Sequence, residues 1–151
     1  MTGPFIIREA TTGDLDGILN LKKQITGLTQ IREREIVDAA TAAHDCLVST
    51  DGSERVIGYV VLSQEAFFGR DLVRLLEVSD RHRRLGVATA LLASALARCT
   101  TKTVFISTNE SNVVMRSLLA HDGWTFSGTL TGLDDGDPEF VFWKEPIDST
   151  K

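Results

Sequence analysis

The stretch DRHRRLGVATALLASALARC, residues 80–99, joins a short cationic turn to a long helical pattern. Small and apolar residues recur at i, i+3, i+4, i+7, i+8 and i+11, which predicts one buried helix face: Ala88, Leu91, Leu92, Ala95, Leu96 and Cys99. A helix start attracts anions through its unpaired N–H groups and its dipole, and Gly86 allows close backbone approach. With Arg83 and Arg84 beside it, the turn predicts either a pyrophosphate site over residues 83–89 or only a solvated basic turn.

Composition limits the class of protein. The chain has 151 residues, which suits a single domain over residues 1–151, and its 42% hydrophobic and 25% charged residues are ordinary for a globular protein. The net charge of -5 argues against general binding to nucleic acid or anionic membranes, so we expect neither partner. Cys46 and Cys99 are too few for a disulfide framework or a zinc site, and we expect both to be buried and structural, with no metal. Without a leader or a spanning segment, we expect a cytoplasmic protein.

The remaining chain alternates strand and helix patterns. Apolar spacing predicts helices over residues 11–25, through Leu15, Ile18, Leu19 and Ile25, and over residues 32–45, through Ile36, Ala40 and Ala43. Two further helices are expected over residues 86–99 and 109–123. Strands are expected over residues 4–10, 46–50, 55–66, 70–80, 101–108, 124–130 and 138–145. This order predicts an α/β domain with a mixed sheet, hairpin-linked in the middle and with helix crossovers in the second half.

Residues 75–92, LLEVSDRHRRLGVATALL, resemble motif A of the GNAT superfamily, the acyl-CoA-dependent N-acyltransferases. The family pattern [QR]-x-x-G-x-[GA] is met by Arg83, Gly86 and Ala88. A second family pattern, N-x-x-A-x-x-L-Y-x-x-x-G-F, is approximated by Asn112, Met115, Leu118, Leu119, Gly123 and Trp124. The resemblance covers nearly the whole chain. It implies a largely antiparallel mixed sheet of about seven strands, flanked by about four helices and splayed between the fourth and fifth strands.

The same resemblance implies acetyl-CoA as co-substrate. Main-chain amides of residues 83–89 would hold its pyrophosphate, and the backbone of Leu76 and Val78, beside a bulge, would bond the acyl and pantetheine arm. Asn112 and Arg116 would contact the pantetheine or phosphate side. The expected cofactor-binding residues are therefore Leu76, Val78, Arg83, Arg84, Leu85, Gly86, Val87, Ala88, Thr89, Asn112 and Arg116.

Two departures from the family pattern concern the turn and the second motif. Asp80 stands where a proline is common, which a loop should tolerate. Leu119 stands where many relatives carry a tyrosine that protonates the leaving thiolate. The single tyrosine of the chain is Tyr59, in an expected central strand, so a tyrosine acid from the helix is excluded.

Direct acyl transfer to an amine benefits from a general base, because a primary amine with a pKa of about 10 is mostly protonated at neutral pH. Glu77 is the first candidate, since burial in its apolar strand would raise its pKa towards a useful range. Alternatively, Glu77 pairs with Arg74 or another arginine, or faces away from the slot. Glu33 and Glu35 either shape an acceptor pocket or form a solvated helix face.

Other candidates have simpler explanations. His82 is either solvated or adjacent to a phosphate. Phe67 and Phe68 are expected to pack on the sheet edge, although an acceptor with an apolar portion would suit them. Residues 134–137, DDGD, either attract a cationic acceptor or form an acidic hairpin loop.

These observations predict an N-acetyltransferase. It would move an acetyl group from acetyl-CoA to a primary amine of a small molecule or peptide, by direct transfer in a ternary complex. The alternative is a non-catalytic acyl-CoA-binding or regulatory module. Another kind of nucleotide-binding domain is disfavoured because GxxxxGK[ST] and GxGxxG are both missing. An exposed edge of the closing strands could support a homodimer.

Overall fold

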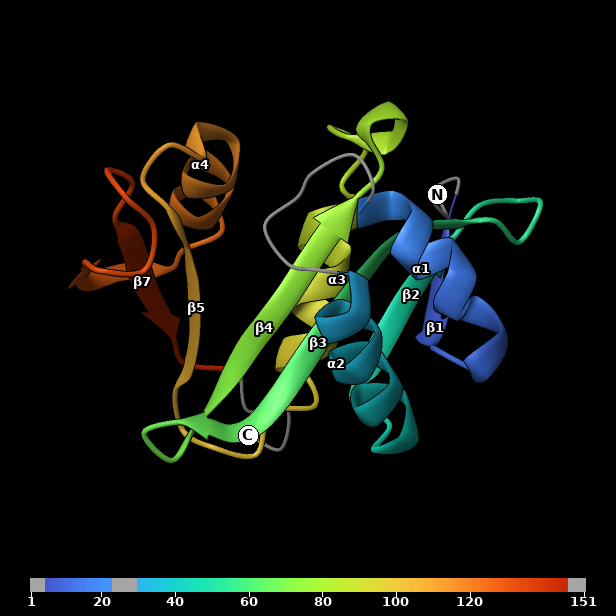
Figure 1. Cartoon of the computed structure of the whole chain (residues 1–151), viewed down its shortest axis with the longest axis horizontal. Coiled ribbons are helices and arrows are strands. Elements are labelled where there is room, and N and C mark those ends of the chain that lie inside the picture. Colours follow the sequence, from blue (N-terminus) through green and yellow to red (C-terminus); the bar gives the residue numbers. More distant parts are fainter. Residues whose placement is uncertain (1–4, 23–29, 147–151) are drawn as a thin grey trace.

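The computed structural model describes residues 5–22 and 30–146, which form one seven-stranded sheet with helices on both faces (Figure 1). The helices are α1 (Leu15–Lys22), α2 (Gln30–Ala42), α3 (Val87–Leu96) and α4 (Val113–His121). The strands are β1 (Ile6–Glu9), β2 (Cys46–Thr50), β3 (Val56–Phe67), β4 (Arg70–Val78), β5 (Val104–Asn109), β6 (Thr125–Leu130) and β7 (Glu139–Lys144). The predicted order of strands and helices is confirmed.

The strand order in the sheet is β1-β2-β3-β4-β5-β7-β6. All neighbouring pairs are antiparallel except β4 and β5, which run parallel because α3 returns the chain across the sheet between them. This is the mixed, largely antiparallel architecture that the sequence predicts.

The parallel pair β4–β5 is short and then opens. In this pair, the segment Asp71–Val73 is matched with the segment Val104–Ile106. Beyond that point both strands continue but no longer pair with each other. Figure 1 shows the two strands meeting at one end and diverging towards Val78 and Asn109. The expected splay between the fourth and fifth strands is therefore confirmed.

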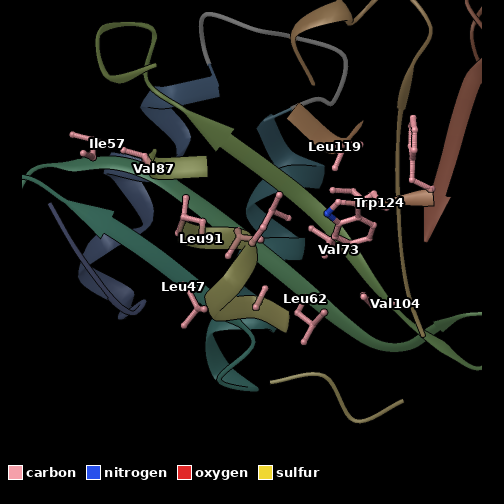
Figure 2. Close-up of a cluster of buried hydrophobic side chains, with 14 residues drawn as sticks. Leu47, Ile57, Leu62, Val73, Val87, Leu91, Val104, Leu119 and Trp124 are labelled. Carbon is pink, nitrogen blue, oxygen red and sulfur yellow. The ribbon is translucent and has the colours of Figure 1, made fainter. Parts of the chain in front are cut away.

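The two faces of the sheet carry separate apolar cores. Val60 and Leu62 of β3 point to the α3 side, where they pack in the cluster around Leu91 and Trp124 shown in Figure 2. Tyr59 and the other intervening residues of β3 point to the side covered by α1 and α2. This alternation follows from the two-residue period of a strand, so the two faces of the sheet contribute side chains to different cores.

Two details of the predicted helices need comment. Ile36 and Ala40 are buried as expected, but Ala43 is exposed because α2 ends at Ala42, so its predicted place on the inner face is wrong. Leu15, Ile18 and Leu19 lie in α1 as predicted, with Ile18 fully buried. Ile25 lies outside the described residues.

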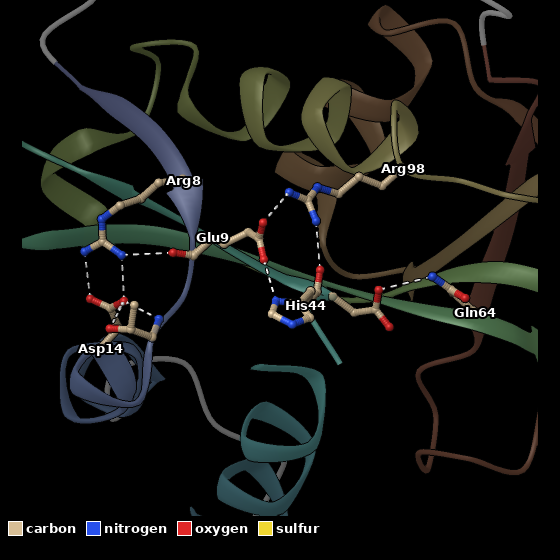
Figure 3. Close-up of polar contacts among 8 residues, drawn as sticks. Arg8, Glu9, Asp14, His44, Gln64 and Arg98 are labelled. Atoms are coloured by element: carbon tan, nitrogen blue, oxygen red, sulfur yellow. Dashed lines mark hydrogen bonds and ion pairs between the residues drawn. The ribbon is translucent and has the colours of Figure 1, made fainter. Parts of the chain in front are cut away.

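Ion pairs stabilise the β1 edge of the sheet (Figure 3). Arg8 donates two hydrogen bonds to the carboxylate of Asp14, at 2.7 and 2.9 Å. Glu9 accepts from His44 at 2.8 Å and from Arg98 at 3.2 Å. The hydrogen bond from His44, followed by that from Arg98, holds the pKa of Glu9 below its ordinary value. These contacts join β1 to the turn before α1, to the turn after α2 and to the segment after α3.

Candidate active site

The turn before α3 presents backbone N–H groups to the surface. Arg84 and Gly86 have φ of 66° and 83°, and such left-handed residues in a tight turn form concavities that bind anions. Gly86 caps α3 without any side-chain hydrogen bond, and no acidic residue lies in the first turn of the helix. The positive end of the α3 dipole is therefore not compensated by a side chain of its own first turn.

A groove of about 500 Å³ runs from this turn to α4, along the diverging end of β4. Nine of the eleven predicted cofactor residues line it: Leu76, Val78, Arg83, Arg84, Gly86, Val87, Ala88, Thr89 and Asn112. The predicted base Glu77 also lines the groove, as does His82, for which a place adjacent to a phosphate was one alternative. Three residues of α4 that the sequence analysis did not assign also line it: Val114, Met115 and Leu118. Met115 follows Asn112 by three residues and Leu118 follows Met115 by three, so helical spacing could have found these two but not Val114.

Leu85 and Arg116 are the two predicted residues that do not line the groove. Leu85 is half exposed at the outside of the turn. The guanidinium of Arg116 donates to the carbonyl oxygen of Glu110 at 2.8 Å and lies 4.9 Å from the centre of the Phe140 ring. Both contacts hold Arg116 against the β7 side of α4, away from the groove.

The backbone of β4 is open on the groove side. Ser79 donates its N–H to Ile57 of β3 at 2.8 Å, and successive residues of a strand point their backbone groups in opposite directions. The N–H and C=O groups of Leu76 and Val78 therefore point away from β3, into the gap left where β5 has diverged. An extended chain of amides can bind such an edge as an added strand would.

A bulge in β4 sets which side chains face which side. Val61 pairs with Leu75 and Leu62 pairs with Val73, so Arg74 is the extra residue. Beyond the bulge, Glu77 lies opposite Tyr59 and shares its face of the sheet, the one covered by α1 and α2. Glu77 thus stands where the splay connects the two faces.

Tyr59 and Glu33 lie beside Glu77 on that face. Both side chains are almost completely buried, and the Tyr59 hydroxyl donates to Oε1 of Glu33 at 3.2 Å. Burial, and then the charges of Glu33 and Glu77, raise the pKa of Tyr59 above its ordinary value. The phenol therefore stays protonated and acts as a donor to Glu33.

The two acidic residues considered on α2 have different environments. Glu33 is only 1% exposed, whereas Glu35 is exposed and accepts a hydrogen bond from Arg32 at 3.0 Å. Their helical positions place Glu33 against the sheet and Glu35 on the outer surface. The solvated-face interpretation is thus confirmed for Glu35 and wrong for Glu33.

Leu119 is fully buried in the apolar core with Trp124, and it is Leu118 that reaches the groove. Asn112 caps α4, accepting from the N–H of Met115 at 3.1 Å. The position where relatives carry a tyrosine therefore supplies an apolar core side chain here, with no proton donor.

The two cysteines are poor nucleophiles. Burial raises the pKa of the Cys46 thiol to about 12, and also that of Cys99 to about 12. Neither is in a disulfide. Cys46 is buried as predicted, whereas Cys99 is only partly buried. Because a thiolate is the reactive form, the raised pKa values disfavour both thiols as nucleophiles at neutral pH.

Phe67 and Phe68 lie at the β3–β4 hairpin, at the opposite end of β4 from the groove. The ring of Phe67 packs 5.0 Å from that of Phe105, and Phe68 is 90% exposed. In the acidic hairpin loop, the Asp137 carboxylate accepts from both the N–H and the hydroxyl of Ser111. Edge packing is confirmed for Phe67, and Asp137 fastens the loop to the start of α4.

No helix within residues 5–22 and 30–146 is long and apolar enough to cross a membrane. In the same part of the chain, no group of three or more His, Cys, Asp or Glu side chains is arranged to hold a metal ion.

Comparison with known proteins identifies this arrangement. The model of the acetyltransferase (GNAT) family matches residues 17–124, so the chain belongs to that family. Comparison with curated protein sequences gives no match.

Solved structures share the fold of this chain. A GNAT-family acetyltransferase from Bacillus cereus is similar over 97% of this chain and 100% of its own, with 29% identity and a TM-score of 0.87. Ard1 from Thermoplasma volcanium is similar over 96% of this chain and 99% of its own, with 19% identity and a TM-score of 0.83. The protein yncA from Salmonella typhimurium, solved with its cofactor acetyl-CoA, is similar over 98% of this chain and 97% of its own, with 16% identity and a TM-score of 0.77.

Proposed function

We propose that this GNAT-family protein transfers an acetyl group from acetyl-CoA to a primary amine of a small molecule or peptide, by direct transfer in a ternary complex. The observation that carries the proposal is the diverging end of β4. There, one strand offers backbone groups to the groove through Leu76 and Val78 and a carboxylate, Glu77, to the other face. Both substrates of a transfer reaction can meet at such a point from opposite sides.

The groove fits the chemistry of coenzyme A. A diphosphate suits the start of α3, which has backbone N–H groups and no side-chain cap. Arg84 and Arg83 also line the groove there, with Arg83 paired to Asp80 at 2.9 Å. At Gly86, a Cβ would have no atom within 4 Å, so the surface there is open to a ligand. The pantetheine amides suit the free edge at Leu76 and Val78, and the apolar side chains of Val114, Met115 and Leu118 suit its methylene groups.

Glu77 is proposed as the general base. Acetyl-CoA supplies a thioester, whose carbonyl carbon accepts the amine nitrogen as the C–S bond breaks. Glu77 removes the proton that the nitrogen must lose, and alignment of the two substrates supplies much of the rate. The leaving thiolate needs no strong acid, because a thiol has a pKa of only about 8.5, so Leu119 does not prevent the reaction.

The nature of the acceptor is part of the proposal. One solved structure of the same fold is the NatC complex bound to Gag peptide and CoA, which is similar over 95% of this chain and 99% of its own, with a TM-score of 0.77. Its identity is 16%, so the likeness concerns the fold alone. That complex binds a peptide together with CoA, which supports a peptide as one class of acceptor in the proposal. A cytoplasmic location and a homodimer formed through the edge strand β6 stay predictions.

The first experiment is calorimetric titration of the purified chain with acetyl-CoA and with CoA, repeated on Gly86→Glu. We expect micromolar binding to the native chain and none to the variant, because the new carboxylate would occupy the anion site. Absence of binding to the native chain would refute the cofactor assignment. A screen of primary amines for CoA release follows; binding without release for any amine would favour the non-catalytic module.

A further inference from the structure

Three elements bring one polar cluster together on the α1/α2 face of the sheet. Glu33 comes from α2, Tyr59 from β3 and Glu77 from β4, and α2 lies over β3 in Figure 1. The hydroxyl of Tyr59 donates to Glu33 at 3.2 Å, and Tyr59 is the direct cross-strand neighbour of Glu77. Val61 and Leu75 are among the apolar side chains on the same face of the sheet.

The direction of the hydrogen bond decides what Tyr59 can offer to Glu77. The hydroxyl group of Tyr59 has one proton, and it donates that proton to Oε1 of Glu33. The phenol oxygen can therefore only accept a hydrogen bond from any other neighbour. Lone pairs can accept from a protonated Glu77 but cannot stabilise its carboxylate. A negative charge on Glu33 acts in the same sense, since a nearby like charge favours the protonated form of a carboxyl group.

We propose that Glu33 is a positioning residue, which acts through Tyr59 to increase the proton affinity of Glu77. This inference rests on the proposed function of Glu77 and explains how a strand carboxylate becomes a sufficiently strong base. Glu33 itself contacts neither substrate, because its side chain is buried between α2 and the sheet.

Other titratable or charged groups also face Glu77 and must be separated from this effect. On the α1/α2 side, the Cys46 thiol of β2 acts on Tyr59, and burial keeps that thiol protonated. Across the groove, the turn before α3 contributes His82, Arg83 and Arg84. The arginines keep a constant charge, and His82 is tested by substitution.

The deciding experiment follows the side-chain carboxyl carbon of Glu77 by ¹³C NMR from pH 3 to pH 9, in the native chain, Glu33→Gln and Glu35→Gln. Glu77→Gln identifies the signal. Glu33→Gln keeps an oxygen that can accept from Tyr59 but removes the charge, so we expect the midpoint to move down by about one pH unit. The exposed Glu35→Gln controls for loss of an α2 charge and should leave the midpoint of Glu77 in place. His82→Asn tests whether the histidine contributes to that midpoint.

A midpoint that is unchanged in Glu33→Gln overturns the proposal. If that variant does not fold, Tyr59→Phe and the native chain decide: the proposal requires a lower midpoint in Tyr59→Phe and a two-step titration of Glu77 in the native chain. Either a single-step titration of Glu77 in the native chain or an unshifted midpoint in Tyr59→Phe would then refute it.

Activity separates this proposal from the proposed function. With an acceptor amine in hand, the acidic limb of the kcat/KM profile should move down in Glu33→Gln by the same interval, with KM for acetyl-CoA unchanged. Loss of stability alone would lower activity at all pH values without moving this limb. The titration requires no substrate, so a shifted midpoint in a chain that acetylates no amine would refute the proposed function and retain the coupling.

Discussion

The two halves of β4 differ in what holds them. In its first half, Leu72 and Val73 are paired on both sides, by β3 and by β5, and the neighbouring Asp71 is fully buried. Its second half, at Leu75–Val78, is paired with β3 alone and borders the groove. One continuous strand thus changes from a structural element to a binding edge where β5 leaves it. Changes in the closed half should affect stability, and changes in the open half should affect binding and chemistry.

The largest expected effect lies in the open half. Glu77→Gln keeps the shape of the side chain and removes the base, so we expect kcat to fall about 10²- to 10⁴-fold while the Kd for acetyl-CoA stays within about twofold. Steady-state rates and calorimetry measure the two quantities. A variant with the native kcat would show that the open half serves binding alone.

The next effect tests the closed half. Oδ1 of Asp71 accepts from the N–H of Glu65 at 2.9 Å, and Oδ2 accepts from the N–H of Thr100 at 2.7 Å. Asp71→Asn would turn an amide NH₂ towards one of these donors, so we expect the free energy of unfolding to fall by about 2–4 kcal/mol in urea titrations. The exposed Asp38→Asn is the control. Native-like stability of Asp71→Asn would contradict the structural role of this half.

A matched pair of glycines separates strain from binding. Gly86 and Gly69 have φ of 83° and 75°, and a Cβ at either would have no atom within 4 Å. Alanine at each should therefore cost a similar amount of stability, about 1 kcal/mol. We expect only Gly86→Ala to weaken acetyl-CoA binding, by about tenfold, in calorimetric titrations. Equal affinities for the two variants would mean that the turn does not approach the ligand closely.

The smallest effect concerns the β1 edge, far from the splay. The hydrogen bonds from Arg8 hold the pKa of Asp14 below its ordinary value of 3.8. The stability from this pair is therefore complete above pH 3.8 and is lost as the pH falls through the lowered folded-state pKa. Asp14→Asn should lower the free energy of unfolding by about 1 kcal/mol at pH 6.

The same variant also makes a pH-dependent prediction. The difference between Asp14→Asn and the native chain should shrink below pH 3.8, as the native carboxyl becomes protonated. Unfolding curves at pH 6 and pH 2.5 measure this change, and the exposed Asp16→Asn is the control. Acetyl-CoA should bind both variants with the affinity of the native chain. A loss of binding would show that the β1 edge of the sheet influences the groove.

Several features of this protein follow from the sequence by itself, because they depend on neighbours in the chain. Helix and strand periodicity predicted the order of the elements, and the residues of a helix start share one short turn. The groove residues from Arg83 to Thr89 were therefore predictable, apart from Leu85, which points outward. The resemblance to the second family motif likewise assigned Asn112 to the cofactor site, although the other groove residues of α4 were missed.

Other features were decided by tertiary structure, because they depend on contacts between distant segments. Arg116 turns to Glu110 and Phe140, which its place in the helix did not reveal. Glu33 and Tyr59 are 26 residues apart and meet only because α2 packs on β3. The side taken by Glu77 depends on a single bulge in β4, since one extra residue reverses every side chain beyond it. Local pattern thus predicted where an anion would bind, and packing across the sheet decided which carboxylate stands at the opening.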